Sequence, residues 1–128
     1  MTTTIFRIAL EVGETAAAAR FYEALFGFAP RPVGGGRSYL DFDEMTLALV
    51  STEDAPRPAP QDLYFEVDDL EALHRRAREL GALSAGEVHG ESGGEIVTRP
   101  WGERSFYAED PWGNGLCFVQ RGTRFTGK

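Results

Sequence analysis

Residues 63–82, LYFEVDDLEALHRRARELGA, predict a strand that leads directly into a helix. Apolar and polar side chains alternate over residues 62–67, which is the period of a half-buried strand. Asp68 and Asp69 can cap a helix, and apolar residues then recur at helical spacing up to Gly81. Basic residues follow the acidic start, the order that opposes the helix macrodipole. The segment is therefore a strand and helix joined without a long loop.

The same pattern occurs near the start of the chain. Alternation over residues 5–12 predicts a strand, and a helical run follows it. Glu14 or Thr15 can accept hydrogen bonds from the first free N–H groups of this helix, and Gly27 is suited to a left-handed helix end. The chain thus contains two strand–helix units.

Spacing indicates that these units are copies of one another. The strand ends Val12 and Val67 are 55 positions apart. RSYLDF from Arg37 matches RSFYAE from Arg104 at a larger offset of 67, so the second half carries an insertion before this strand. Internal self-similarity of this kind predicts two equivalent structural units.

The rest of the chain divides into strands, loops and a linker. Residues 29–36 and 84–94 are rich in glycine and are expected to be loops. Residues 52–61, TEDAPRPAPQ, hold three prolines and predict a linker between the halves, and residues 122–128 are expected to be a flexible tail. Further strands are expected at residues 37–42, 45–51, 95–99, 104–109 and 115–120.

Composition narrows the class of protein. The chain has 128 residues, 42% hydrophobic, which suits one globular domain, here residues 1–121. Its formal charge of -7 disfavours nucleic acid and anionic membranes as partners. Cys117 is the only cysteine, so no internal disulfide is possible, and no apolar run near the start has signal-peptide or transmembrane length. We expect a cytoplasmic α+β protein.

Three segments together resemble a known family: ARFYEALFGF (19–28), LYFEVDDLEALHRRARELGA (63–82) and WGERSFYAEDPWGNGLCFVQ (101–120). Their order, spacing and duplication are similar to those of the vicinal oxygen chelate superfamily, which includes glyoxalase I, extradiol dioxygenases and bleomycin resistance proteins. The resemblance implies two tandem βαβββ modules, about residues 4–51 and 62–121. Their sheets would form a curved mixed sheet around a cleft, with the helices outside.

The resemblance also implies where a metal would be bound. Metal-dependent members place His or Gln on the first strand of each module and Glu on the last strand. The matching positions here are Arg7, Asp62, Ala48 and Cys117. Only Asp62, with Cys117 as a weak second, suits a divalent ion, so we expect no metal and no cofactor. Arg7 and Asp62 are instead expected to form an ion pair, the alternative being that each faces water.

Three other residues carry reactive groups without the partners that chemistry needs. His74 is expected on the solvent side of its helix, and His89 is expected to be exposed in the glycine-rich loop. Neither has metal-ligand spacing. Cys117 lacks a histidine base, so a small buried residue is a better interpretation than a nucleophile.

Aromatic residues provide the strongest indication of a ligand. Strand alternation is expected to place Tyr39, Tyr64 and Phe106 on one side, with charged residues beside them. Trp101 and Trp112 lie at strand or loop ends and could cap a site; core or dimer packing is an equal alternative for each. The predicted ligand-binding residues are Arg7, Tyr39, Asp62, Tyr64, Trp101, Arg104, Phe106 and Cys117.

We therefore expect a metal-independent small-molecule binding protein of the drug-sequestration type, similar to bleomycin resistance proteins. The expected partner is a cationic or aromatic small molecule, and the resemblance implies a homodimer. The alternative is an enzyme, a lyase, isomerase or oxygenase acting on a metabolite or natural-product intermediate, with Asp62 or Glu66 as a base. A third possibility is a partner-binding domain whose cleft is unused.

Overall fold

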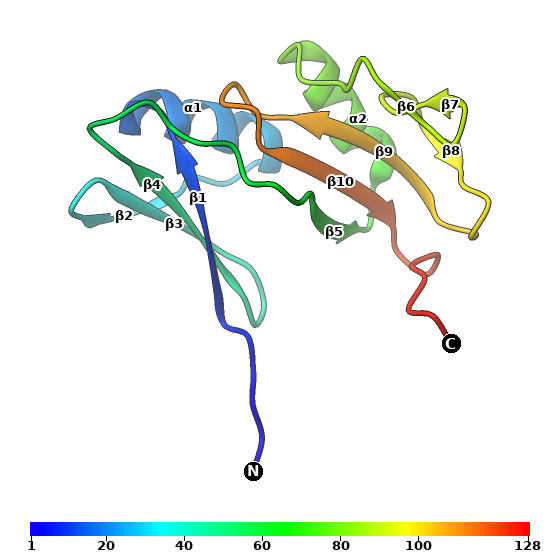
Figure 1. Ribbon diagram of the computed structural model, residues 1–128, viewed down its shortest axis with the longest axis horizontal. Coiled ribbons are helices and arrows are strands. Elements are labelled where there is room, and N and C mark those ends of the chain that lie inside the picture. The colour runs from blue at the N-terminus through cyan, green and yellow to red at the C-terminus, as the bar shows by residue number, and fades with distance from the viewer. The chain divides into compact units, whose positions relative to one another are not determined.

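The structure is a computed structural model that describes all 128 residues. It divides into two compact units, residues 1–59 and residues 60–128, which we call module one and module two. Each module holds one α-helix and a four-stranded sheet (Figure 1).

Module one has the sheet order β1-β4-β3-β2, with β1 parallel to β4 and the other pairs antiparallel. The helix packs against β3 and β4. The elements are β1 (Arg7–Val12), α1 (Thr15–Phe26), β2 (Arg31–Gly34), β3 (Arg37–Asp41) and β4 (Thr46–Ser51).

Helix α1 begins and ends where the sequence predicts. The Glu14 carboxylate accepts hydrogen bonds from the N–H groups of Ala16 and Ala17, at 3.0 and 3.2 Å. Gly27 has a φ of 86° and donates its N–H to Glu23 at 2.8 Å. The left-handed conformation satisfies a free carbonyl and turns the chain away from the helix axis.

Module two repeats this arrangement in the order β5-β10-β9-β8, with β5 parallel to β10. Asp69 caps its helix by accepting the Ala72 N–H at 3.0 Å. The elements are β5 (Leu63–Val67), α2 (Leu70–Glu79), β6 (Glu87–Val88), β7 (Glu91–Ser92), β8 (Val97–Thr98), β9 (Arg104–Glu109) and β10 (Gly115–Gln120).

The predicted fold class is confirmed. Each four-stranded sheet is built from strand, helix and three further strands, so the protein is α+β with two βαβββ modules. Module two adds the small hairpin β6-β7 within its insertion. Neither helix is long and apolar enough to span a membrane.

Two segments predicted to be loops contain strands. Residues 29–36 include β2, and residues 84–94 include β6 and β7. β2 forms the edge of its sheet, where Pro32 is tolerated because an edge residue needs no partner for its missing N–H on the outer side. A prediction that assigns segments rich in glycine and proline to loops therefore misses short strands such as these.

The helix-facing side of module two is an aromatic core. The Phe65 and Phe118 rings stack with centroids 5.3 Å apart, and Phe106 stacks on Phe118 at 5.2 Å. Phe106 and Phe118 are completely buried. The rings belong to β5, β9 and β10, so they join three strands beneath α2.

The register of the strands corrects the predicted equivalence of the modules. Tyr39 of β3 lies opposite Ala48, and Tyr107 of β9 lies opposite Cys117, the residue that corresponds to Ala48. Tyr39 is therefore equivalent to Tyr107, not to Phe106. The predicted offset of 67 is one residue short, and a one-residue slip moves every side chain to the other face.

Candidate ligand site

Three side chains meet on the face of the module two sheet that α2 does not cover, which we call the open face. Tyr64, Cys117 and Tyr107 are direct neighbours in register on β5, β10 and β9. Their neighbours along each strand are the phenylalanines of the core, so alternation directs this row away from the helix. Tyr64 is exposed, Tyr107 is half-buried and Cys117 is completely buried.

These three neighbouring groups resist ionisation. Burial raises the pKa of the Cys117 thiol to about 12, against the opposing effect of its hydrogen bond to Tyr107. Burial and then the neighbouring Cys117 raise the pKa of Tyr107 far above its ordinary value. Burial, and then the neighbouring Cys117 and Asp62, also raise the pKa of Tyr64. At neutral pH the three groups are uncharged.

A pocket of about 520 Å³ opens on this face. The volume lies within the range of roughly 300–1,000 Å³ usual for small-molecule sites. Five aromatic residues line it; Phe65 also stacks in the core, and the other four supply flat apolar surfaces suited to stacking. The wall is made by Tyr64, Phe65, Glu66, Trp101, Glu103, Tyr107, Val119, Arg124 and Phe125.

The charged groups of the pocket give it an acidic character. Glu103 is only 9% exposed, and no cation pairs with its carboxylate. Its two oxygens accept hydrogen bonds from the Trp101 indole and the Phe125 backbone N–H, each at 2.8 Å. Glu66 forms an ion pair with Arg124 at 3.6 Å. Two carboxylates against one guanidinium favour a cationic or neutral ligand over an anion.

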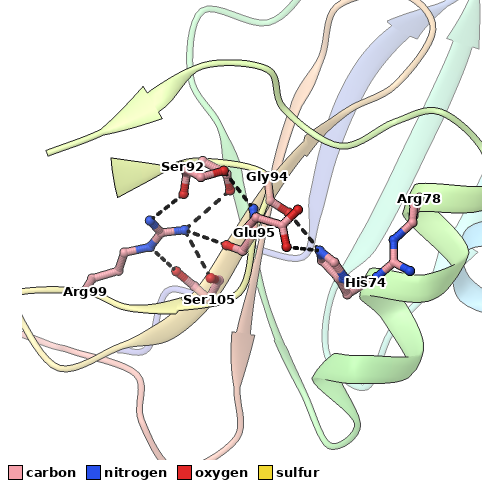
Figure 2. A network of polar contacts seen from close by, with 8 residues as sticks. His74, Arg78, Ser92, Gly94, Glu95, Arg99 and Ser105 are labelled. Atoms are coloured by element: carbon pink, nitrogen blue, oxygen red, sulfur yellow. Dashed lines mark hydrogen bonds and ion pairs between the residues drawn. The ribbon is translucent and has the colours of Figure 1, made fainter. Parts of the chain in front are cut away.

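A buried arginine supports the pocket from behind. Arg99 is 2% exposed and has no carboxylate partner (Figure 2). It donates to the Ser105 hydroxyl at 3.0 Å, the Ser105 carbonyl at 3.1 Å and the Ser92 carbonyl at 3.0 Å. Longer bonds of 3.4 Å reach the carbonyls of Gly93 and Glu95. Backbone dipoles stabilise the charge of Arg99. The same hydrogen bonds connect the loop after β7 to β9.

The backbone of Arg99 also shapes the turn that carries Trp101. Its N–H donates to the Glu103 carbonyl at 2.7 Å, and its carbonyl accepts from Gly102 at 2.9 Å. The His89 ring contacts the indole in a T-shaped arrangement, with ring centroids 5.1 Å apart. Trp101 is thus held by its turn, by Glu103 and by an exposed histidine.

His74 is buried, so its predicted position on the solvent side is wrong. It is 5% exposed and shares the inward side of α2 with Leu70 and Ala77, at positions separated by four and three residues. Nε2 lies 2.9 Å from the Gly94 carbonyl and Nδ1 lies 3.1 Å from the Arg78 guanidinium (Figure 2). A carbonyl only accepts and a guanidinium only donates, so Nε2 carries the hydrogen. The His74 ring therefore has a structural role: it connects α2 to the loop that contains Gly94.

A smaller hollow of about 280 Å³ lies on the other side of the two tyrosines. Tyr64 and Tyr107 line both hollows, and Asp62, Glu109 and Gly115 line this one. A Cβ at Gly115 would collide with the Asp62 carboxylate, so the glycine allows Asp62 to lie over β10. The predicted residues Asp62 and Tyr64 therefore belong to one surface.

In module one, Arg7 and Tyr39 also come together. The Arg7 guanidinium donates to the Tyr39 hydroxyl at 3.4 Å and lies 5.8 Å from the ring centroid. Arg31 lies 5.6 Å from the same ring and pairs with Asp41 at 3.0 Å. Two guanidinium groups therefore lie over the Tyr39 ring on the helix-free side of its sheet.

Two predicted residues lie on the wrong face for this role. Phe106 is completely buried under α2, and Arg104 forms an ion pair with Glu71 of α2 at 2.6 Å. The predicted placement of both beside Tyr64 is wrong because of the one-residue offset error. Tyr107 takes that place, and counting outward from Cys117 along the hairpin could have identified it.

Glu103 and Phe125 were also missed by sequence reasoning. Glu103 belongs to a turn and Phe125 to the tail, where no periodic pattern assigns a side chain to a face. Tertiary contacts, among them the hydrogen bond from the Phe125 N–H to Glu103, bring the two residues to one pocket.

The residues at the positions of the superfamily metal ligands do not fit a divalent ion. Arg7 contributes a cation and Ala48 a methyl group. Cys117 is completely buried with a thiol that stays protonated, so Asp62 is the single suitable ligand. Within each module, no group of three or more His, Cys, Asp or Glu side chains is arranged to hold a metal.

Fold and site together define a member of a known superfamily of small-molecule enzymes and binding proteins. The sequence model of the Glyoxalase/Bleomycin resistance protein/Dioxygenase superfamily matches residues 4–118. The chain belongs to this superfamily, which confirms the resemblance predicted from its motifs.

Solved structures similar to this chain carry different functional names. Oxidase ChaP-H1 is 27% identical, with a TM-score of 0.78, over 99% of this chain and 100% of that one. Oxidase ChaP-H2 is 25% identical, with a TM-score of 0.77, over the same shares. A glyoxalase/bleomycin resistance protein from Albidiferax ferrireducens T118 is 19% identical, with a TM-score of 0.69, over 93% of this chain and 100% of that one. A comparison with curated protein sequences found no match.

Proposed function

We propose that the protein binds a small, flat organic molecule, cationic or neutral, on the open face of module two without using a metal ion. The observation that carries the proposal is the pocket walled by Tyr64, Trp101, Tyr107 and Phe125 with Glu66 and Glu103 inside it. Aromatic walls beside carboxylates suit a ligand with a delocalised positive charge.

Other residues contribute polar contacts in this proposal. Asp62 is exposed, and no hydrogen bond or ion pair engages its carboxylate, which leaves it available to a ligand. Cys117 is completely buried beside Tyr107 in the sheet, so in this proposal it supports the wall without touching the ligand. Arg7 and Tyr39 offer a second contact surface on module one. The predicted ion pair of Arg7 with Asp62 stays a prediction, because the two residues belong to different modules.

We further propose that the protein is a cytoplasmic homodimer, as the superfamily resemblance implies. Binding without chemistry would make it a sequestering protein of the bleomycin resistance type.

A second candidate function is an oxidase or oxygenase. It is favoured by the likeness to oxidases ChaP-H1 and ChaP-H2, the former 27% identical over 99% of this chain. In this alternative the pocket holds a substrate, and Asp62 is a better base than Glu66, whose carboxylate is engaged by Arg124 and the Gly122 N–H. The lack of suitable ligands at the metal positions argues against the metal-dependent version.

A fluorescence titration tests the binding proposal. Trp112→Phe leaves Trp101 as the single tryptophan, so its emission reports the pocket. We expect saturable quenching by the planar cation thioflavin T and much weaker quenching by the anion 8-anilinonaphthalene-1-sulfonate. Equal binding of the two dyes would contradict the acidic character of the site, and no binding of either would reject the pocket.

Native mass spectrometry of freshly purified protein separates the two functions. A dimer carrying an organic molecule, returned unchanged after incubation in air, supports sequestration. A stoichiometric metal ion would overturn the metal-independent proposal. Conversion of the carried molecule to an oxygenated product would establish the oxidase alternative.

A further inference from the structure

The last residues of the chain fold back onto module two after β10. The Arg121 N–H donates to the Val67 carbonyl at 2.8 Å, which extends the pairing of β10 with β5. The Thr123 hydroxyl donates to the Gln120 carbonyl at 2.8 Å and accepts the Arg104 N–H at 3.1 Å. We call residues 121–125 the strap.

Carboxylates of the pocket hold the strap in place. Glu66 accepts the Gly122 N–H at 3.2 Å and pairs with Arg124 at 3.6 Å. Glu103 accepts the Phe125 N–H at 2.8 Å. The strap is therefore attached through the charged groups that line the pocket.

Glu103 joins two parts of the pocket wall. One oxygen accepts the Trp101 indole N–H and the other accepts the Phe125 N–H, each at 2.8 Å. The carboxylate is nine-tenths buried, so loss of either bond would leave an unpaired oxygen in a poorly hydrated place. The positions of Trp101 and Phe125 are thus coupled through one side chain.

The Phe125 ring is not buried by this arrangement. It remains 56% exposed while its backbone is tied down, and the ring lines the pocket. A tail docked only for stability would bury its largest apolar group, because burial is the main source of stabilisation. Here the ring is presented at the pocket instead, where a bound flat molecule would cover it.

From these contacts we infer that Glu103 is a positioning residue, and that the strap with Phe125 determines which ligands the pocket accepts. Glu103 fixes the Trp101 and Phe125 rings so that both contact the ligand, and the strap narrows the site to flat molecules. This inference rests on the proposed binding function, since it assigns the selectivity of that same pocket.

The coupling is tested first without any ligand. Gln at position 103 has one accepting oxygen, so Glu103→Gln keeps at most one of the two bonds. We expect the Phe125 amide to exchange its hydrogen about tenfold faster, and trypsin to cleave after Arg121 and Arg124 faster. Glu91→Gln, which changes an exposed glutamate of β7, is the matched control. Unchanged exchange, unchanged cleavage and unchanged Trp101 emission, measured with Trp112→Phe in both proteins, would overturn the positioning role, because the lost bond must release either Phe125 or Trp101.

The selectivity is tested with dyes on folded variants. Phe125→Ala and a chain ending at Gln120 are each compared with wild type for thioflavin T and for the bulky, non-planar cation crystal violet. We expect both variants to bind thioflavin T about tenfold more weakly, because each loses an aromatic contact with the ligand. We expect both to bind crystal violet as well as wild type does, or better. Phe125→Ala alone decides the matter if the shorter chain does not fold.

The two proposals fail in different ways. If wild type binds thioflavin T and Phe125→Ala binds both dyes as wild type does, the strap inference is overturned and the binding function stands. If wild type binds neither dye while Glu103→Gln still releases the strap, the pocket is not a ligand site and the selectivity part of the inference fails with it.

Discussion

The guanidinium of Arg99 lies 5.3 Å from the centroid of the Tyr107 ring, so a completely buried cation supports the back of an aromatic pocket wall. The same side chain donates to one hydroxyl and four backbone carbonyls on β7, the loop after it and β9. Stability and pocket shape therefore depend on one residue.

Arg99→Met is expected to destabilise the protein by about 3 kcal/mol, because it leaves several buried acceptors without a donor. Urea unfolding measures this loss. The matched control is Arg75→Met on the exposed side of α2, for which a change within about 0.5 kcal/mol is expected. Similar losses in both variants would show that the Arg99 network contributes nothing specific.

Neighbouring residues of β9 should respond oppositely to truncation. Phe106→Ala removes a ring from the core and should cost about 3–5 kcal/mol of the free energy of unfolding. Tyr107→Ala removes a half-buried pocket wall and should weaken thioflavin T binding about tenfold with a smaller loss of stability. Tyr107→Phe keeps the ring and removes the hydroxyl, so it shows how much of the binding depends on each. The reverse pattern, with binding lost in a folded Phe106 variant, would contradict the register.

Cys117 should make the protein sensitive to alkali. The unfolded thiol ionises near pH 9, whereas burial raises the folded pKa to about 12. Folding therefore favours the protonated thiol, and this stabilisation is complete below pH 9 and is lost as the pH rises toward 12. Between pH 9 and pH 12 the thiol should lower the free energy of unfolding by about 1.4 kcal/mol for each pH unit.

Cys117→Ser removes the titrating thiol and should flatten the pH dependence by that amount. Urea unfolding of both proteins at pH 8, 9, 10 and 11 is the measurement, and both tyrosines remain in each as common background. Parallel curves for the two proteins would show that the thiol does not carry the effect.

Gly115→Ala should displace the Asp62 carboxylate at little cost. The added Cβ would occupy the place of Oδ1, but the end of an exposed side chain can rotate away. We expect a loss of stability below about 1 kcal/mol and a turned Asp62 in a crystal structure of the variant. A loss of several kcal/mol would mean that Asp62 is held rigidly, and Asp62→Ala combined with Gly115→Ala should then restore stability.

Local chemistry made much of the fold predictable. The caps at Glu14, Gly27 and Asp69 agree with the structure because each depends on hydrogen bonds within a few residues. The strands at residues 104–109 and 115–120 agree as well, since the turn between them is set by its own sequence: Asp110 accepts the N–H groups of Trp112 and Asn114. The superfamily followed from the order of such segments.

The errors arose where distant residues decide the outcome. His74 is buried because the loop carbonyl of Gly94 and the side chain of Arg78 provide its partners. Phe106 and Tyr107 were interchanged because the internal alignment was one residue off, and a one-residue slip exchanges the two faces of a strand.

By itself the sequence determined the helices, most strands, the duplication and the superfamily, because capping, periodicity and turn chemistry act over a few residues. Only the tertiary structure decided that Tyr107 replaces Phe106 at the pocket, and that Glu103 joins Trp101 to Phe125. Strand register and hydrogen bonds between remote segments set these contacts, and they depend on the packing of the whole module.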